Sequence, residues 1–245
     1  SDALRGMAAK SPAPVESFGI AAEAAEHPRW RADGIEYGPS GTIFNVHHDS
    51  ECLGDVETAL SGAFNVRNCL AAIAGAYAVG ASWDGIREGL RTFRSVRRRM
   101  EIRGEARGVT VIDDFAHNPD KIAATLATLH AFPGRVLACF QPHGYGPLRT
   151  MRRELIGCFA EHLREEDVLI LSDPVYYGGT TDRSVGSGDI AEGVRAAGRK
   201  AEHIAGREAS AERLAALARP GDRILVMGAR DDSLAQFARD LLARL

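Results

Sequence analysis

The chain has 245 residues, of which 45% are hydrophobic, and its formal net charge at pH 7 is -3. It is long enough for one large domain or two smaller ones around a packed core. The near-zero charge argues against long-range attraction to nucleic acid or anionic lipid, although arginines cluster at residues 97–99 and 149–153. We therefore expect no nucleic-acid or membrane partner, and only local binding of phosphate.

The four cysteines are scattered without the C-x-x-C spacing of metal and redox sites. This pattern favours reduced core thiols in a cytoplasmic protein over disulfides or a metal site. No apolar run approaches the length of a membrane span, and no signal-peptide pattern opens the chain. Because the chain begins at Ser1 and residues 1–10 resemble the middle of a helix, we expect a fragment of a longer protein.

Residues 1–62 alternate short strand patterns with Gly- and Pro-rich turns, which predicts a partly antiparallel sheet. The GPSG sequence at residues 38–41 is typical of a hairpin turn. A helical period follows over residues 63–79, with Asn65 placed to cap its start, and a shorter helix is predicted over residues 83–93. The strand candidates are residues 14–20, 34–37, 42–47 and 54–60.

The charged segment at residues 95–100 marks a switch from helical to strand patterns, and we place a domain boundary there, giving domains 1–95 and 96–245. Beyond it, strands alternate with single helices, which predicts a Rossmann-like α/β domain with a mainly parallel sheet and an antiparallel hairpin at its entry. The predicted strands are residues 100–103, 109–113, 135–140, 167–172, 201–205 and 223–227. The predicted helices are residues 120–130, 148–163, 188–197, 210–218 and 233–245.

The stretch VTVIDDFAHNPD at residues 109–120 carries the first candidate site. A β-branched strand ends in Asp113 and Asp114, and His117 follows, so three polar groups crowd the carboxyl end of one strand, where α/β sheets bind ligands. The carboxylates could accept the hydroxyls of a ribose, and the histidine could donate to a phosphate or a substrate oxygen. Asn118 and Pro119 match the first positions of a helix instead.

A second candidate site is the loop FQPHGYGPLR at residues 140–149, which follows the next strand in sequence. If the two strands are neighbours, His143 and Arg149 face the same crevice as His117, and a cation beside a Gly-rich turn suits an anionic substrate. The alternative is a loop whose glycines and prolines only turn the chain.

Three further groups are weaker candidates. The guanidinium groups of residues 97–99 could reach a phosphate at the domain boundary, or they could be a solvated charge run. The carboxamides of Asn65 and Asn68 could match the donor and acceptor edge of adenine. The segment YYGGTTD at residues 176–182, with Ser187 and Asp189 beyond it, is a substrate-facing loop or only a long connection. No P-loop motif occurs, and no G-x-G-x-x-G follows a strand.

As a set, these motifs resemble those of the Mur ligase family. The matching segments are GAFNVRNCLAAIA (62–74), VRRRM (96–100), DDFAHNP (113–119), FQPH (140–143) and GDRILVMGA (221–229). Their order and spacing cover roughly residues 60–230. Within the family, some segments are similar to the branch that adds L-alanine to UDP-N-acetylmuramate and others to the branch that reattaches a recycled tripeptide.

The resemblance implies the C-terminal part of an ATP- and Mg²⁺-dependent ligase that joins an amino acid or peptide to a UDP-muramyl carboxylate through an acyl-phosphate. Asn65 or Asn68 would contact adenine, Asp113 would hold the ribose, and Arg98 or its neighbour would approach the nucleotide. His117, His143 and Arg149 would act on the amino-acid and muramyl side. The P-loop and the metal ligands would precede this region, in a central ATPase domain that is truncated here.

Two other interpretations remain open. The His117-Asn118-Pro119 sequence is also similar to the form seen in folylpolyglutamate and cyanophycin synthetases, which would keep the fold and change the substrate. The chain could also be a non-catalytic module that binds a nucleotide or an amino acid.

Overall fold

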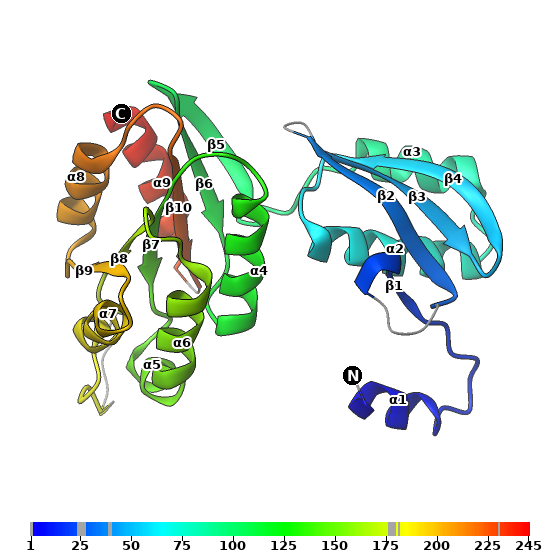
Figure 1. Ribbon diagram of the computed structural model, residues 1–245, viewed down its shortest axis with the longest axis horizontal. Coiled ribbons are helices and arrows are strands. Elements are labelled where there is room, and N and C mark those ends of the chain that lie inside the picture. The colour runs from blue at the N-terminus through cyan, green and yellow to red at the C-terminus, as the bar shows by residue number, and fades with distance from the viewer. Residues whose placement is uncertain (1, 24–27, 39–40, 176–179, 181, 230) are drawn as a thin grey trace. The chain divides into compact units, whose positions relative to one another are not determined.

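The computed structural model describes residues 2–23, 28–38, 41–175, 180, 182–229 and 231–245. The chain forms two compact units, Ser1–Ser95 and Val96–Leu245 (Figure 1). Each unit contains a sheet with helices packed against it. The architecture is therefore α/β, with a mixed sheet followed by a mainly parallel sheet, and it confirms the fold class predicted from the sequence.

The first unit is built on a four-stranded sheet in the order β1-β2-β3-β4. The strand β1 pairs parallel to β2, whereas β2, β3 and β4 form an antiparallel meander, so the sheet is mixed. Gly38 pairs with Gly41 at the predicted hairpin, but the two residues between them lie outside the described part of the chain. The bounds are α1 Asp2–Ala8, β1 Phe18–Ile20, the 3-10 turn Ala21–Glu23, β2 Trp30–Gly38, β3 Gly41–His48 and β4 Glu51–Thr58.

Two helices, α2 (Ala63–Ala78) and α3 (Trp83–Thr92), cover one face of this sheet. Alternate residues of β3, such as Phe44 and Val46, are fully buried against them, as the period-2 pattern requires. The residue that caps α2 is Gly62, at φ 97°, so the prediction that Asn65 caps this helix is wrong. Asn65 lies inside the first turn, where its side-chain nitrogen donates to the Ser61 carbonyl at 2.8 Å.

The second unit contains a six-stranded sheet in the order β5-β6-β10-β7-β8-β9. The entry strand β5 is antiparallel to β6, as predicted, and the other five strands are parallel. The strands are β5 Glu101–Ala106, β6 Val109–Asp114, β7 Val136–Gln141, β8 Val168–Leu171, β9 Lys200–His203 and β10 Arg223–Gly228. The helices are α4 Pro119–His130, α5 Tyr145–Thr150, α6 Arg152–His162, α7 Ser187–Ala196, α8 Arg207–Leu217 and α9 Ser233–Arg244.

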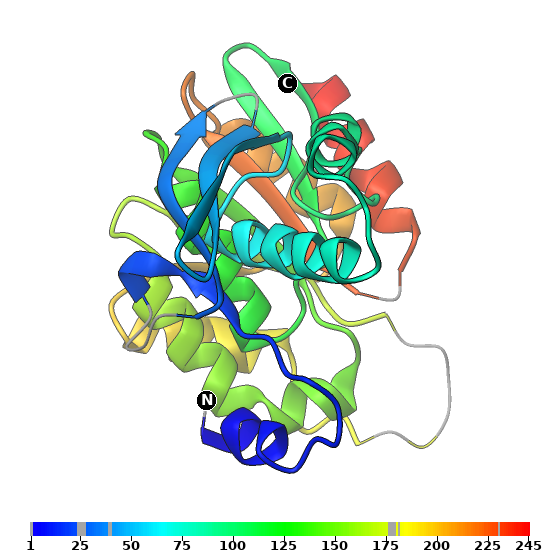
Figure 2. The same ribbon diagram turned by 90° about the vertical axis from the view of Figure 1, so that its right-hand side faces the viewer.

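Helices cover both faces of this sheet. The cluster on one face joins α4, α5, α6 and α7 to the sheet, and the cluster on the other joins α8 and α9, as can be followed in Figures 1 and 2. Every residue of β7 and β10 is buried, which explains why their sequences are nearly continuous apolar runs. Three cysteines lie in these cores or in that of the first unit, whereas Cys52 is exposed, and all four are free thiols. Burial raises the pKa of Cys139 to about 11.

One prediction about the second unit is wrong, and one condition that the sequence left open is not met. The apolar pattern over residues 148–163 suggested a single helix, but the chain forms α5 and α6, separated at Met151, whose φ of -95° and ψ of 14° depart from helical values. The strands β6 and β7 were considered as possible neighbours because they are consecutive in sequence. They are instead separated by β10, the last strand of the sheet in chain order, which pairs with both.

Candidate functional site

The carboxyl ends of β6, β10 and β7 lie side by side at one edge of the six-stranded sheet. In the strand register, Asp114 is opposite Met227, and Gln141 is opposite Gly228. The polar segments that follow β6 and β7 therefore leave the sheet at the same edge, on either side of β10. This is the edge at which parallel sheets bind ligands.

The loop after β6 is held by local hydrogen bonds. The Asn118 side chain accepts from the Lys121 main-chain nitrogen at 3.1 Å and Pro119 follows it, which confirms that these two residues start α4. Asp114 is 6% exposed, and its carboxylate accepts from the main-chain nitrogens of Met100 at 2.7 Å and Ala116 at 2.8 Å. Asp114 thus organises the chain around the site.

Asp113 is fully buried, and its Oδ1 accepts from Nε of Arg98 at 3.1 Å. Its other oxygen, Oδ2, has no hydrogen-bond partner among the residues that the structure describes. Burial raises the pKa of Asp113, and the Arg98 guanidinium opposes that rise. The structure thus brings together two residues that the sequence assigned separately to a nucleotide.

His117 and His143 lie close together although they follow strands that are not neighbours. Their ring centroids are 5.9 Å apart with an angle of 31° between the planes. Nδ1 of His117 lies 2.8 Å from the Phe115 carbonyl oxygen. Because a carbonyl only accepts, Nδ1 carries the proton of this bond, and Nε2 is left as the second ring nitrogen that can face a ligand.

The Phe115 ring contacts both His117 and the guanidinium groups of Arg98 and Arg99. Phe115 meets His117 edge-on, with centroids 5.3 Å apart. The guanidinium carbons of Arg98 and Arg99 lie 5.2 Å and 5.3 Å from the Phe115 ring centroid. Arg98 is buried and Arg99 is exposed, so of these two stacked cations only Arg99 presents its side chain to solvent.

Arg149, on α5, forms an ion pair with Asp182 in the segment between β8 and α7. Both side chains are about half exposed, so this pair is accessible to water. The sequence put Arg149 in a crevice with His117 only on the condition that β6 and β7 are neighbours, and the contact that the structure shows for Arg149 is with Asp182.

Most of the YYGGTTD segment, residues 176–179 and 181, lies outside the described part of the chain. The residues beyond it have roles within the fold. The Ser187 hydroxyl donates to the Ser172 carbonyl at 2.7 Å, and the Asp189 carboxylate accepts from the Gly186 main-chain nitrogen at 2.8 Å. Both contacts organise the start of α7.

Asn65 and Asn68 belong to the first unit and lie on the same face of α2. Nδ2 of Asn68 donates to Oδ1 of Asn65 at 3.4 Å, a long contact. Asn65 is half-buried and bonded to Ser61, whereas Asn68 is exposed. Of the two carboxamides, that of Asn68 is therefore the more accessible to a base edge.

Sequence reasoning missed Arg207, the first residue of α8. Its guanidinium donates to Oε1 of Gln141 at 2.8 Å and to Oγ of Ser233 at 2.6 Å, and it pairs with Asp231. Hydrogen bonds from Ser233 and Arg207 outweigh burial and hold the pKa of Asp231 below its ordinary value. The partners lie far apart in sequence, so no local pattern indicated this cluster.

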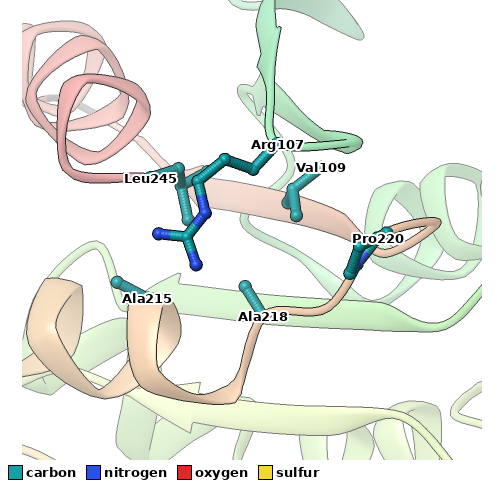
Figure 3. A pocket seen from close by; sticks show the side chains of 6 residues that line it. All are labelled: Arg107, Val109, Ala215, Ala218, Pro220 and Leu245. Atoms are coloured by element: carbon teal, nitrogen blue, oxygen red, sulfur yellow. The ribbon is translucent and has the colours of Figure 1, made fainter.

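A small cavity of about 90 Å³ lies near the opposite edge of the sheet, where β6 and β10 begin. Figure 3 shows the Arg107 side chain reaching across it, above Ala215 and Ala218. It contains none of the candidate residues. Among the described residues, no group of three or more His, Cys, Asp or Glu side chains could hold a metal ion, and no helix is long and apolar enough to cross a membrane.

The mainly parallel sheet, with helices on both of its faces, defines an α/β domain. The sequence profile described as "Mur ligase, glutamate ligase domain" matches residues 98–230, and that of the "Mur ligase middle domain" matches residues 1–76. The chain belongs to the Mur ligase family.

The relatives give finer comparisons. The chain is 38% identical over 218 residues to the UDP-N-acetylmuramate--L-alanine ligase of Anaeromyxobacter sp. (strain Fw109-5), covering 89% of this chain and 47% of the relative. The structure of UDP-N-acetylmuramate-alanine ligase MurC from Thermotoga maritima has a TM-score of 0.73 at 22% identity, covering 94% of this chain and 47% of that one. MurF from Thermotoga maritima, solved in complex with ADP, has a TM-score of 0.64 at 19% identity, covering 90% and 48%. The chain spans about half the length of these relatives.

Proposed function

We propose that the chain is the C-terminal portion of an ATP-dependent amide ligase of peptidoglycan synthesis or recycling, working in the cytoplasm. The ligase would join an amino acid or peptide to the carboxylate of a UDP-N-acetylmuramate-type substrate through an acyl-phosphate. The observation that carries the proposal is the approach of His117 and His143 to 5.9 Å at the carboxyl edge of a Mur ligase domain. The 38% identity to a UDP-N-acetylmuramate--L-alanine ligase favours L-alanine as the amino acid.

His117 and His143 would face the substrates, and Arg149 would assist them. Two imidazoles and an arginine can hold an anionic substrate and stabilise the oxyanion that develops when an amine attacks an acyl group. For this role the Arg149 guanidinium must either break its ion pair with Asp182 or bind the substrate and Asp182 at the same time. Because the pair is about half exposed, exchanging partners costs little.

We expect Asn65 and Asn68 in the first unit, and Arg98 and Asp113 in the second, to bind the nucleotide. The exposed Asn68 carboxamide offers the donor and acceptor that an adenine edge requires. Arg98 is buried and paired with Asp113, whereas its neighbours Arg97 and Arg99 are exposed at the surface. Bound ATP would supply the phosphoryl group, and we expect the Mg²⁺ ligands outside this chain.

We further propose that residues 1–95 are the C-terminal part of the central domain and that residues 96–245 are the C-terminal domain. The division into two compact units at the same position supports this boundary. Sequences upstream of Ser1 would supply the phosphate-binding half of the central domain.

The complete protein tests the function. We expect it to release ADP in the presence of UDP-N-acetylmuramate, L-alanine, ATP and Mg²⁺, and His117→Ala or His143→Ala to reduce kcat by about 10²-fold or more. His162→Ala, on α6, is a matched control that should retain activity. Turnover that is unchanged in both site variants would contradict the proposal.

The choice of substrates separates the alternatives. Replacing L-alanine by a tripeptide tests the recycling branch. Replacing the muramyl substrate by a folate or a polyamide tests the interpretation suggested by the His117-Asn118-Pro119 sequence. Nucleotide or amino-acid binding without turnover for any of these substrates would favour a non-catalytic module.

A further inference from the structure

A hydrogen-bonded network built on two arginine side chains crosses the carboxyl ends of β6, β10 and β7. It runs from Asp113 through Arg98 to Asp231, and from there through Arg207 to Gln141. The two terminal residues belong to the two strands that carry the histidine loops. Asp113 precedes His117 by four residues, and Gln141 precedes His143 by two.

Arg98 forms the first half of this network. Its three guanidinium nitrogens donate to Asp113 Oδ1 at 3.1 Å, to the Gly228 carbonyl at 2.7 Å and to the Asp231 carbonyl at 3.2 Å. Arg98 is 6% exposed, and a planar guanidinium that is buried with three fixed acceptors has little freedom to move. It therefore ties the end of β6 to the segment that follows β10.

Arg207 forms the second half, with side chains as its three acceptors. Its nitrogens reach Gln141 at the end of β7, Asp231 after β10, and Ser233 at the start of α9. Gln141 is 4% exposed, so its amide oxygen has little access to water in place of the guanidinium. Asp231 is shared by the two arginines, through its main-chain carbonyl on one side and its carboxylate on the other.

The connection matters because β6 and β7 do not pair with each other. Two strands that flank a third lie about 10 Å apart, yet the two histidine rings are separated by only 5.9 Å. The two imidazole rings therefore approach each other more closely than the two strands do. The ladder hydrogen bonds stop at Gly228, so beyond that point the arginine network supplies cross-links between the strand ends.

We propose that Arg98, Asp231 and Arg207 are positioning residues that set the spacing and orientation of His117 and His143. The inference rests on the proposed function only in treating the two histidines as residues of the site. Its test requires no substrate. A failed ligase assay would not contradict the positioning role of these residues. A failed test of the positioning role would not contradict the proposed ligase function.

The test compares two variants of the same helix in the full chain. Arg207→Met removes the cross-link to β7. Arg213→Met is the matched control, because Arg213 lies on the exposed surface of α8 and its guanidinium forms a bidentate pair with Glu202 of β9. With ¹³C-labelled histidine, the measurement is the ring-proton NOE between His117 and His143 together with their ring chemical shifts. Circular dichroism checks that each variant is folded.

We expect Arg207→Met to reduce the NOE by about half or more and to shift the His143 ring signals, because loops released from cross-links sample wider positions. Arg213→Met should leave both signals as in the parent chain. An unchanged NOE in folded Arg207→Met, or an equal loss in Arg213→Met, would overturn the proposal.

Gln141→Leu keeps the test open if Arg207→Met does not fold. This variant retains the Arg207–Asp231 pair and removes only the acceptor on β7. It should reproduce the loss of the NOE, and the double variant should show no further loss, because both changes cut the same link. A Gln141→Leu chain with the parent NOE would also overturn the proposal.

Discussion

At the amino edge of the six-stranded sheet, Asp167 and Asp222 each pair with a cationic or imidazole side chain and also accept from main-chain nitrogens. Asp167 accepts from His130 at 2.8 Å, from the Val136 nitrogen at 2.8 Å and from the Arg164 nitrogen at 2.7 Å. At the carboxyl edge, Asp113 instead leaves one oxygen without a hydrogen bond within the described residues. The histidines beside it are only half-buried.

The difference separates two uses of buried charge in one sheet. The amino-edge carboxylates bind the loops that precede the strands, and they accept hydrogen bonds from several groups of the protein itself. The carboxyl edge keeps incompletely bonded and partly exposed groups together, at a cost in stability, as sites that bind ligands commonly do. Variants at the two edges should therefore differ in what they damage.

The largest effect is expected for Asp167→Ala at the amino edge. Three donors lose their acceptor at a fully buried position, so we expect a loss of about 3 to 5 kcal/mol in the free energy of unfolding. Urea unfolding followed by circular dichroism measures it. Both tryptophans, Trp30 and Trp83, lie in Ser1–Ser95, so their fluorescence follows the other unit. A shift confined to the fluorescence transition would contradict the prediction.

The next largest effect is expected for Gly228→Ala at the carboxyl edge. Gly228 has φ 154°, and an added Cβ would lie 2.8 Å from the Gln141 carbonyl oxygen and 2.7 Å from a Leu234 methyl. We expect a loss of about 2 to 4 kcal/mol and a weakened His117–His143 NOE.

The control for this variant is Gly198→Ala. Gly198 also has a positive φ, at 83°, but nothing lies within 4 Å of its added Cβ. Its cost should be limited to the backbone term of about 1 kcal/mol, with the NOE retained. Equal losses in the two variants would show that contact at the end of β10 is unimportant.

The third prediction concerns the pH dependence caused by Asp113. Because burial raises its pKa in the folded state, its contribution to stability is fully present below the unfolded pKa of about 3.9 and is lost as pH rises through the folded pKa. Asp113→Asn removes this loss. In urea unfolding from pH 4 upward, the variant should gain stability relative to the parent chain as pH rises. The opposite trend would mean that attraction to Arg98 outweighs burial.

The smallest effect is expected for Glu202→Gln. Hydrogen bonding to Arg213 lowers the pKa of Glu202, so its contribution is present above the unfolded pKa and is lost as pH falls through the folded pKa. The pair is exposed, and salt screens it. At neutral pH and moderate salt the denaturation midpoint should not move measurably. A clear shift of the midpoint would mean that this exposed ion pair contributes as much to stability as the buried pairs at the two edges of the sheet.

The sequence predicted features that depend on neighbouring residues. The start of α4 depends only on residues that are close in sequence. The side-chain oxygen of Asn118 accepts from the main-chain nitrogen of Lys121, three residues later, and Pro119 has no N–H that would need an acceptor. The alternation of strands with helices in the second unit was likewise visible in the apolar period. His117 was chosen for its place after a strand, and the structure puts it at the carboxyl edge.

What failed depends on distant residues or on fine backbone geometry. No local pattern indicates that residues 223–228 insert between β6 and β7, so the sequence left the strand order open. Arg207 was missed because its partner Gln141 is 66 residues away. Asn65 looked like a cap by residue type, but Gly62 takes that position with a positive φ.

The insertion of β10 has a consequence for the order in which the molecule is built. The strands β6 and β7 are made early, with a gap of one strand between them, and residues 223–228 emerge from the ribosome more than eighty residues later. Until then both strands present an unpaired edge to the gap, a condition that invites association with other chains. The two histidine loops cannot reach their final spacing during that interval, so the site is completed only when its central strand arrives.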